Sequence, residues 1–479
     1  MESREVVIVG SGPSALRAAI ACEDGGANPL IVDEFGIGSA SGSPPVAGIA
    51  ASIDELDPKS HIDDTLASGG ESCNIDTVSR TCGQAVATLA ELERWGLTIR
   101  RREGGLPHAS PAPGHQIPRL TGCGDSTVRE VIRILEEQVI KRGIQRITDH
   151  LPLSIVSDNS QVRGLVTINV ATGQIEPFQT KAVILATDGH QGLWSSSSQG
   201  SGTGSALAIS SGISLNGMGN TPKHALTTRD SGIHIPFEVL GSGGRIRREN
   251  GDDVGPEEVL EGEPCVLDLR GLDSDAAIWF SQTSSRIMDR LGLDISSDVI
   301  PISPGVAYTT GGAPCDEEGR VLLGSNHSDG DSTKLWHTGL YAAGRSAHTG
   351  MHGVAPLAGN LLLDDLVSGK AAGAHAATWV QGSHFGGIPQ IDQATMDASG
   401  MISSLREGGE LTVGSFTSKL SSVVSKGASS REAALAEVKG MRELGIRLTD
   451  TSEIMNTELV EAIRLNGLAS VAEEIMASG

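Results

Sequence analysis

Aromatic side chains and positive charges are both scarce in this sequence. Phe, Trp and Tyr make up 3% of its 479 residues, and 36 Lys and Arg face 59 Asp and Glu, so that the formal net charge is −23. Few aromatic rings leave little surface on which single-stranded bases could stack, and a strongly negative chain repels polyanions and anionic lipid headgroups. We therefore expect neither nucleic acid nor a membrane surface as a partner.

Long apolar runs and paired cysteines are also missing. No stretch reaches the length that crosses a bilayer, and the chain enters its first expected strand without the segments of a signal peptide. The six cysteines show no C-x-x-C pair or other ligand spacing, so we expect reduced thiols and no iron–sulfur cluster in this chain. His348 and His352 are four residues apart, but Gly350 and Gly353 interrupt any helix there, so we expect no metal site. These features predict a cytoplasmic protein without direct membrane insertion.

The first residues predict a strand, a glycine turn and a helix. Residues 6–9 are all β-branched, which is typical of a strand buried on both faces. Gly10, Ser11 and Gly12 then turn the chain into a helix with Pro13 in its first turn, where a missing N–H does little harm. Free N–H groups and the helix dipole at such a turn form an anion site shaped for a pyrophosphate.

Two further features complete a dinucleotide fingerprint. Ala15 stands at the third small position of G-x-G-x-x-G/A, where helix and strand approach closely. A second apolar strand, residues 29–32, ends in Asp33, and an acid about 20 residues after the glycines is what a ribose hydroxyl needs. We predict a dinucleotide site here, against the alternative of a glycine-rich turn without a ligand.

Strand and helix signals continue to alternate along the chain. Helical spacing marks residues 76–95 and 126–142, the second with Asp125 and Ser126 at its N-cap, and strands are expected at 165–170 and 182–185. The pattern predicts a Rossmann-like α/β fold. Changes in composition divide it into a nucleotide-binding domain (1–219 and 303–380), an inserted α+β capping domain for the substrate (220–302) and a helical C-terminal domain (385–479).

An ordered series of segments resembles the flavoproteins of the fumarate reductase, succinate dehydrogenase and L-aspartate oxidase family. The matching segments are, in chain order, Gly10-x-Gly12-x-x-Ala15, Val46-Ala-Gly-Ile49, Asp64-Thr65, Arg119 with residues 125–131, and residues 186–189, 202–204, 308–320, 339–344 and 349–364. The resemblance covers nearly the whole chain. It implies an FAD held between the nucleotide-binding and capping domains.

The same resemblance implies which residues contact the FAD. They are Gly10, Ser11, Gly12, Pro13, Ser14, Ala15, Asp33, Glu34, Ser41, Gly48, Thr187, Thr203, Gly344, Arg345, Asn360, Leu361 and Leu362. Family members in membrane complexes attach FAD covalently through a histidine at the position of Ser41. Because a serine hydroxyl cannot form that bond, we expect non-covalent FAD, as in aspartate oxidases.

The substrate positions depart from the family pattern. His224 aligns with a substrate histidine of the family and is the expected catalytic residue. Where the family has a histidine and two arginines, this chain has Ala307, Leu240 and Pro356, and apolar side chains cannot bind a carboxylate or move a proton. The family's glutamate after Gly344 is Arg345, and its serine after Asn360 is Leu361. Asp188 stands where the family's Ala-Thr-Gly-Gly segment has a glycine.

Two explanations of these departures stay open. The catalytic charge could come from Arg245, or from its neighbours Arg247 and Arg248, although such a cluster can equally be a solvated surface. Alternatively, the substrate is less acidic than a dicarboxylate. We expect an FAD-dependent oxidoreductase that transfers hydride between flavin N5 and a small (di)carboxylate. The alternatives are an L-aspartate oxidase-like enzyme and a catalytically weakened flavoprotein subunit or scaffold.

The expected partners follow from the same resemblance. A small carboxylate is the expected substrate, and an iron–sulfur or other electron-transfer subunit is a candidate protein partner. Oxygen, a quinone reached through partner subunits and NAD all remain open as electron acceptors.

Overall fold

The computed structural model describes residues 1–36, 45–54, 58–194, 200–229, 231–323, 335–426 and 430–477. Its first strand, β1, lies inside an eight-stranded sheet. In order across that sheet the strands are β15 (Arg320–Leu322), β16 (Trp336–Ala342), β7 (Gln161–Asn169), β8 (Gln174–Leu185), β1 (Glu2–Val9), β2 (Pro29–Val32) and β5 (Gln145–Ile147), with β6 (His150–Asp158) paired to β7.

Strand β1 is buried on both faces, as its β-branched residues predict. Val6 and Ile8 belong to the core that contains α1 (Pro13–Asp24) and α10 (Asn360–Gln381). Val7 and Val9 belong to the opposite core, which includes residues of α5 (Thr203–Ser210) and of the C-terminal helices. Such two-sided burial is the usual condition of a parallel strand covered by helices.

The parallel strands of this sheet end at one level. Strands β5, β2, β1, β8 and β16 run parallel, and Val9 is in register with Val32 and with Leu185, which is itself in register with Ala342. The residues after these strands therefore meet at one edge. In open α/β sheets this carboxyl edge is where ligands bind.

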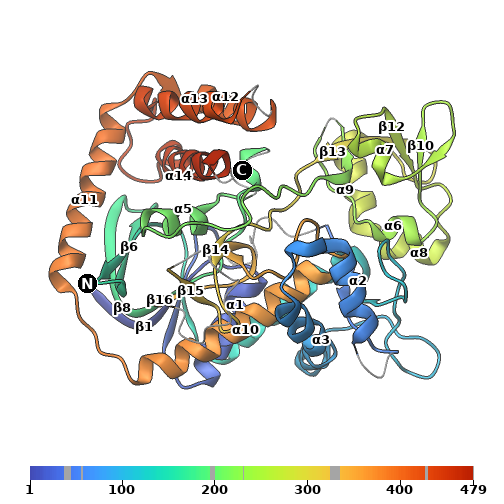
Figure 1. Ribbon diagram of the computed structural model, residues 1–479, viewed down its shortest axis with the longest axis horizontal. Coiled ribbons are helices and arrows are strands. Elements are labelled where there is room, and N and C mark those ends of the chain that lie inside the picture. Colours follow the sequence, from blue (N-terminus) through green and yellow to red (C-terminus); the bar gives the residue numbers. More distant parts are fainter. Residues whose placement is uncertain are drawn as a thin grey trace.

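A second, antiparallel sheet forms a separate lobe at one end of the molecule (Figure 1). Its order is β11 (Asp253–Val254), β10 (Arg245–Arg248), β12 (Cys265–Asp268), β13 (Val299–Gly305) and β9 (His224–Thr228). Its helices are α6 (Glu238–Gly241), α7 (Pro256–Leu260), α8 (Ser274–Trp279) and α9 (Ser281–Leu291).

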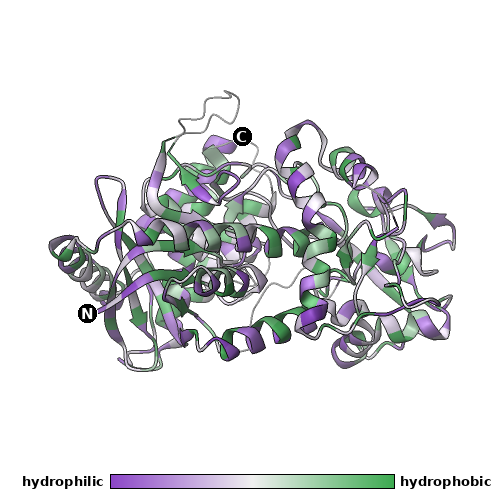
Figure 2. Cartoon of the chain, turned by 90° about the horizontal axis from the view of Figure 1, so that it is seen from below, coloured by the Kyte–Doolittle hydropathy of each residue, from purple (hydrophilic) through white to green (hydrophobic). Residues whose placement is uncertain are grey.

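The C-terminal helices cover the other end. Helix α11 (Ile388–Glu407) runs along the edge of the large sheet and leads to α12 (Val413–Lys426), α13 (Arg431–Leu444) and α14 (Thr457–Ala477) (Figure 1). Figure 2 shows the lobes from another side, with hydrophilic and hydrophobic residues mixed along the covering helices. Among the described residues, none of the helices has the length and apolarity that crossing a bilayer requires.

The remaining helices and short strand pairs complete the fold. They are α2 (Lys59–Gly69), α3 (Ile75–Trp95), α4 (Thr127–Lys141) and the short pairs β3 (Ile49–Ala50) with β4 (Leu120–Thr121), β14 (Ala313–Pro314) with β17 (Ala347–His348), and β18 (Leu411–Thr412) with β19 (Ile446–Arg447).

The expected N-cap of α4 is wrong in one respect. Ser126 makes no capping hydrogen bond with its side chain. The Asp125 carboxylate instead accepts the backbone N–H groups of Gln282 (3.3 Å) and Thr283 (2.6 Å) at the start of α9. Asp125 therefore joins the two lobes instead of capping its own helix.

Candidate functional site

A pocket opens at the carboxyl edge of the large sheet. Its walls come from the turns after β1, β2 and β8 and from the segment before α5. The lining residues are Gly10, Ser11, Gly12, Asp33, Glu34, Phe35, Thr187, Asp188 and Ser201. Six of the expected cofactor residues thus meet in one place, where the strand register predicts a ligand.

The glycine turn has the geometry that a pyrophosphate needs. Gly10 has φ +124°, and a Cβ there would lie 2.2 Å from the carbonyl oxygen of Ala186. A Cβ at Gly12 would meet no protein atom within 4 Å, and Gly12 caps α1 without a side-chain hydrogen bond. The first amides of α1 therefore face open space, as an anion site requires. Ser14 and Ala15 are buried behind them.

The two acidic residues after β2 are each held by an arginine. The Asp33 carboxylate accepts hydrogen bonds from the guanidinium of Arg146 (Nε–Oδ2 3.1 Å) and from the backbone N–H of Phe35 (3.0 Å). Glu34 Oε2 lies 3.1 Å from both Nε and Nη2 of Arg464 on α14. Burial raises the pKa of Glu34, and the charge of Arg464 opposes that rise.

An ion pair that the family pattern does not contain lies beside the glycine turn. Arg345 Nη2 is 3.2 Å from Asp188 Oδ1, and both side chains are buried. Gly344, with φ +57°, brings this turn so close to α1 that a Cβ would lie 2.6 Å from the hydroxyl of Ser14. The nearby Asp365 carboxyl is also buried, which raises its pKa to about 7.

Thr187 and Thr203 tie the pocket wall to α5. The Thr187 hydroxyl accepts the N–H of Gly204 (3.0 Å) and lies 3.0 Å from the hydroxyl of Ser346. Thr203, the first residue of α5, lies 2.8 Å from the Ser201 hydroxyl and hydrogen-bonds to Glu34. Thr187 thus connects the turn after β8 to the start of α5, and Thr203 connects the start of α5 to Glu34.

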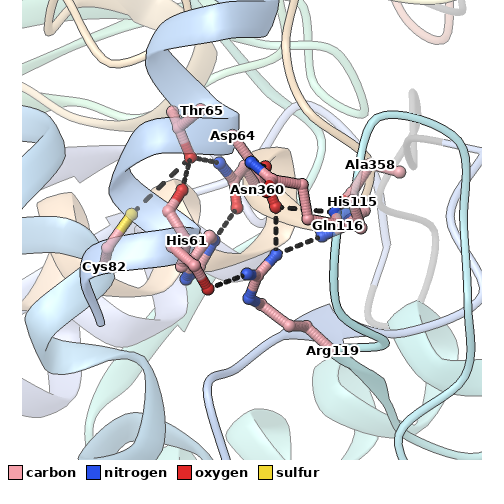
Figure 3. A network of polar contacts seen from close by, with 10 residues as sticks. His61, Asp64, Thr65, Cys82, His115, Gln116, Arg119, Ala358 and Asn360 are labelled. Carbon is pink, nitrogen blue, oxygen red and sulfur yellow. Dashed lines mark hydrogen bonds and ion pairs between the residues drawn. The ribbon is translucent and has the colours of Figure 1, made fainter. Parts of the chain in front are cut away.

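The side chain of Asn360 belongs to a buried polar network (Figure 3). Its Oδ1 accepts from His61 Nε2 (2.8 Å) and its Nδ2 donates to Thr65 Oγ1 (2.9 Å). An ion pair between Arg119 and Asp64 (2.5 Å), of which neither side chain is more than 2% exposed, lies in the same network. Asn360 is the first residue of α10, so these side-chain hydrogen bonds fix the start of the helix. The first amides of α10 have no acceptor within the helix.

The other expected cofactor residues lie around this helix end. Leu361 packs against Ala307 and Tyr308 in a small apolar cluster, and Leu362 is fully buried. Gly48 lies where a Cβ would approach the backbone N of Thr121 to 3.0 Å. Ser41 lies outside the described residues.

His224 is buried at the start of β9. Its Nε2 lies 2.7 Å from the carbonyl oxygen of Ile235, so that this nitrogen carries the proton, and Nδ1 has no hydrogen-bond partner among the described residues. Burial lowers the pKa of His224 to about 3. The ring is therefore neutral, and its Nδ1 can only accept a hydrogen bond.

Arg245 is not brought together with His224. Strands β12 and β13 lie between β10 and β9, a separation of three strand spacings or about 14 Å. The Arg245 side chain is 60% exposed and pairs with Asp253 at 3.0 Å. The neighbouring Arg247 and Arg248 are paired as well, with Asp253 and Asp268 and with Glu258.

Arg286 on α9 is a cation that the sequence did not single out. It is exposed and makes no ion pair within the part of the chain that the structure describes. Burial and the charge of Arg286 together lower the pKa of His234 to about 4, and the His234 and His224 rings are 5.9 Å apart. The charges of Arg286 and Asp125 act on each other, and Arg286 also acts on His234. Sequence spacing alone could not reveal these neighbours.

The described residues form no candidate metal site. No group of three or more His, Cys, Asp or Glu side chains there could hold an ion.

Comparison with known proteins identifies the cofactor of this chain as FAD. A family model described as an FAD binding domain matches residues 5–362. The succinate dehydrogenase flavoprotein subunit of Rickettsia bellii is 24% identical over 98% of this chain and 86% of its own length. L-aspartate oxidase of Mycobacterium leprae is 29% identical over 78% of this chain and 75% of its own length.

A solved structure shares the fold. A mutated FrdA subunit of E. coli quinol fumarate reductase superposes with a TM-score of 0.89 at 23% sequence identity, covering 100% of this chain and 89% of that chain.

Proposed function

Because this chain belongs to the FAD-binding flavoprotein family that contains these succinate dehydrogenase, fumarate reductase and L-aspartate oxidase relatives, we propose that it oxidises or reduces a small carboxylate. The family makes it an FAD-dependent oxidoreductase. The substrate and the residues that hold it are our inference.

The observation that carries the proposal is the glycine turn at the carboxyl edge. Open space in front of Gly12 and the uncapped start of α1 fit the FAD pyrophosphate. When bound, FAD supplies N5 as the atom that accepts or releases hydride. The lobe with β9 and α9 stands beside this edge, and its residues are the candidates for binding the substrate.

Within that lobe we assign the substrate carboxylate to Arg286. A guanidinium binds a carboxylate with two parallel hydrogen bonds, and Arg286 makes no ion pair with another described residue. Arg245 and Arg247 are already paired with carboxylates of their own sheet, and Arg248 with Glu258 of α7. His224 serves as a neutral hydrogen-bond acceptor, because its pKa of about 3 leaves it uncharged.

A second candidate is oxidation of an amino acid, as the name of the L-aspartate oxidase relative describes. The state of His224 favours it. Because Nε2 donates to Ile235, the remaining Nδ1 can accept a hydrogen bond from an ammonium or hydroxyl group but cannot donate one to a second carboxylate.

A substrate screen on the purified protein tests both candidates. Flavin absorbance is followed without oxygen after addition of succinate, L-aspartate and other small carboxylates. Bleaching by one of them supports the proposal and names the substrate class. A flavin that no carboxylate bleaches, with an unchanged reoxidation rate in H224A, supports the weakened subunit instead. A colourless protein that takes up no added FAD contradicts the assignment as a whole.

Arg286→Met separates substrate binding from general damage. We expect KM for the active carboxylate to rise at least about tenfold, since a charged hydrogen bond is lost, while FAD binding is unchanged. Arg290→Met is the matched control, because Arg290 is an exposed arginine one turn further along α9. Equal KM values in the two variants contradict the role of Arg286.

We also propose that FAD is held without a covalent bond, since Ser41 cannot form the histidyl linkage. Denaturation in acid should release all the flavin into the supernatant. Flavin that stays with the precipitated chain contradicts this.

An electron-transfer subunit, with iron–sulfur or other redox groups, is our proposed partner, because two of the relatives are named as flavoprotein subunits. The division into residues 1–219 with 303–380, 220–302 and 385–479 is likewise proposed as the domain organisation.

A further inference from the structure

The Glu34–Arg464 pair joins the cofactor pocket to the C-terminal helix α14. Glu34 lines the pocket that the glycine turn forms. Arg464, 430 residues later, reaches it with both Nε and Nη2 at 3.1 Å from the same oxygen, Oε2. The side chains are 7% and 10% exposed, so the pair lies largely out of water, where such a contact is strong.

Arg464 has little freedom to leave this position. Its guanidinium lies over the Phe35 ring, 4.8 Å from the ring centre. Helix α14 itself packs on α5, where Leu468 approaches Gly202 and Gly467 approaches Ala206. The arginine is therefore anchored by its own helix and by the residue that follows Glu34.

Glu34 needs such a partner if it is to meet the cofactor as a carboxylate. The charged groups that act on it are Asp33 beside it and Arg464. Asp33 repels the charge of Glu34, and burial disfavours that charge further. Asp33 is itself occupied by Arg146 and the Phe35 amide. Glu34 also has a hydrogen bond with Thr203 of α5, but the cation that holds it lies on α14.

We propose that Arg464 is a positioning residue of the FAD site, which holds the Glu34 carboxylate against the pocket wall so that it accepts hydrogen bonds from sugar hydroxyls of the cofactor. The inference rests on the assignment of FAD to this pocket. Arg464 touches Glu34 and acts on the cofactor only through it, so the C-terminal helix is part of the cofactor site.

FAD titration of apoprotein tests the proposal, with quenching of flavin fluorescence as the readout. Arg464→Met should weaken FAD binding about tenfold or more, the scale of losing a charged hydrogen bond. Arg442→Met is the matched control: Arg442 lies on neighbouring α13, pairs with Glu473 at 2.8 Å, and its loss should leave the Kd for FAD unchanged.

A double-mutant cycle distinguishes positioning from a structural role of α14. In a Glu34→Gln background, R464M should cause no further loss of affinity, because its target carboxylate is gone. If R464M binds FAD like the wild type, or weakens binding equally in both backgrounds, the proposal is overturned. Failure of the wild-type protein to bind FAD would instead contradict the proposed function.

Discussion

At the scale of single residues, the buried pair Asp64–Arg119 makes the sharpest stability test. The pair is almost inaccessible to water, and Gln116 also donates to Asp64 from its backbone (2.9 Å) and side chain (2.7 Å). Asp64→Asn removes one carboxylate from a buried ion pair, so we expect a loss of about 3–5 kcal/mol in the free energy of unfolding. Urea denaturation of the apoprotein measures it.

The control for this substitution is Asp54→Asn. Asp54 also pairs with an arginine, Arg102, but both side chains are more than a third exposed. Water and salt screen such pairs, and the unfolding midpoint should barely move. Equal losses in the two variants would show that burial does not set the strength of the Asp64 pair.

His190 predicts a dependence of stability on pH. Burial lowers its pKa to about 4, so the folded protein keeps it neutral while the unfolded chain protonates it near the ordinary value of 6.5. Stability is therefore lost as pH falls below 6.5, by about 2 kcal/mol at pH 5 from this residue alone. His190→Gln should remove this contribution, so its apoprotein melting temperature should fall less between pH 7 and 5 than that of the wild type.

His384 offers the comparison, since it is exposed. His384→Gln should leave the pH profile of the melting temperature unchanged. A profile of H190Q that matches the wild type would mean that His190 protonates equally in both states.

At the scale of elements, the glycine turn before α1 separates folding from cofactor binding. Gly12→Leu adds a side chain where the first atom meets no protein atom, at an ordinary φ of −77°. We expect apoprotein of unchanged melting temperature that binds FAD at least about a hundredfold more weakly, since the side chain fills the space of the pyrophosphate. Fluorescence titration and thermal melts check the two halves.

Gly10→Ala should lower both the melting temperature of the apoprotein and its affinity for FAD. Its Cβ would overlap the Ala186 carbonyl at a φ of +124°, so the melting temperature falls together with FAD affinity. If Gly12→Leu lowers stability as much as Gly10→Ala does, the open space before α1 is not a ligand site.

The sequence predicted this element better than it predicted the contacts of the lobe that holds β9 and β10. The turn at residues 10–15 is local: a strand, two glycines and a helix start specify each other within one short segment. Arg464 could not be found in this way, because it meets Glu34 only after α14 has packed on α5. Arg245 illustrates the opposite error, since clustered charge near His224 in sequence is separated from it by two strands.

Two departures from the family pattern explain each other. Asp188 replaces a glycine and Arg345 a glutamate, and the structure pairs them at 3.2 Å. Read singly, each substitution looks like a loss. Only the fold shows that they form one contact, since they follow two strands that are neighbours in the sheet but distant in the chain.

At the scale of the molecule, two carboxylates link the lobe of the antiparallel sheet to the rest of the protein. Asp125 accepts amides of α9, and Glu238 on α6 accepts the N–H of Ala47 at 2.9 Å. Glu238 Oε2 has no hydrogen-bond partner within the described ranges, and burial raises the pKa of Glu238 to about 7. The Glu238 carboxyl therefore becomes a buried charge near neutral pH, at the contact between the lobe and the rest of the protein.

Glu238→Gln should stabilise the protein in alkaline solution. The folded protein holds a proton on Glu238 up to a pH of about 7, whereas the unfolded chain loses it near 4.5. Stability is thus lost as pH rises above 4.5, and removing the charge should gain up to about 3 kcal/mol at pH 8 and little at pH 5. Melting temperatures at the two pH values measure this.

Glu257→Gln is the reference for that comparison, because Glu257 on α7 is exposed. It should shift neither value. A gain of E238Q that is equal at pH 5 and pH 8 would show that Glu238 does not titrate in this range.

The contact between Glu34 and Arg464 also bears on how the protein is made. The two residues are 430 positions apart, and a ribosome that adds 5–20 residues per second needs roughly 20–90 seconds to travel between them. During that interval the glycine turn can fold while the acid of its pocket still lacks its arginine. Full-strength capture of the cofactor thus belongs to the finished chain, and a nascent chain binds flavin only loosely.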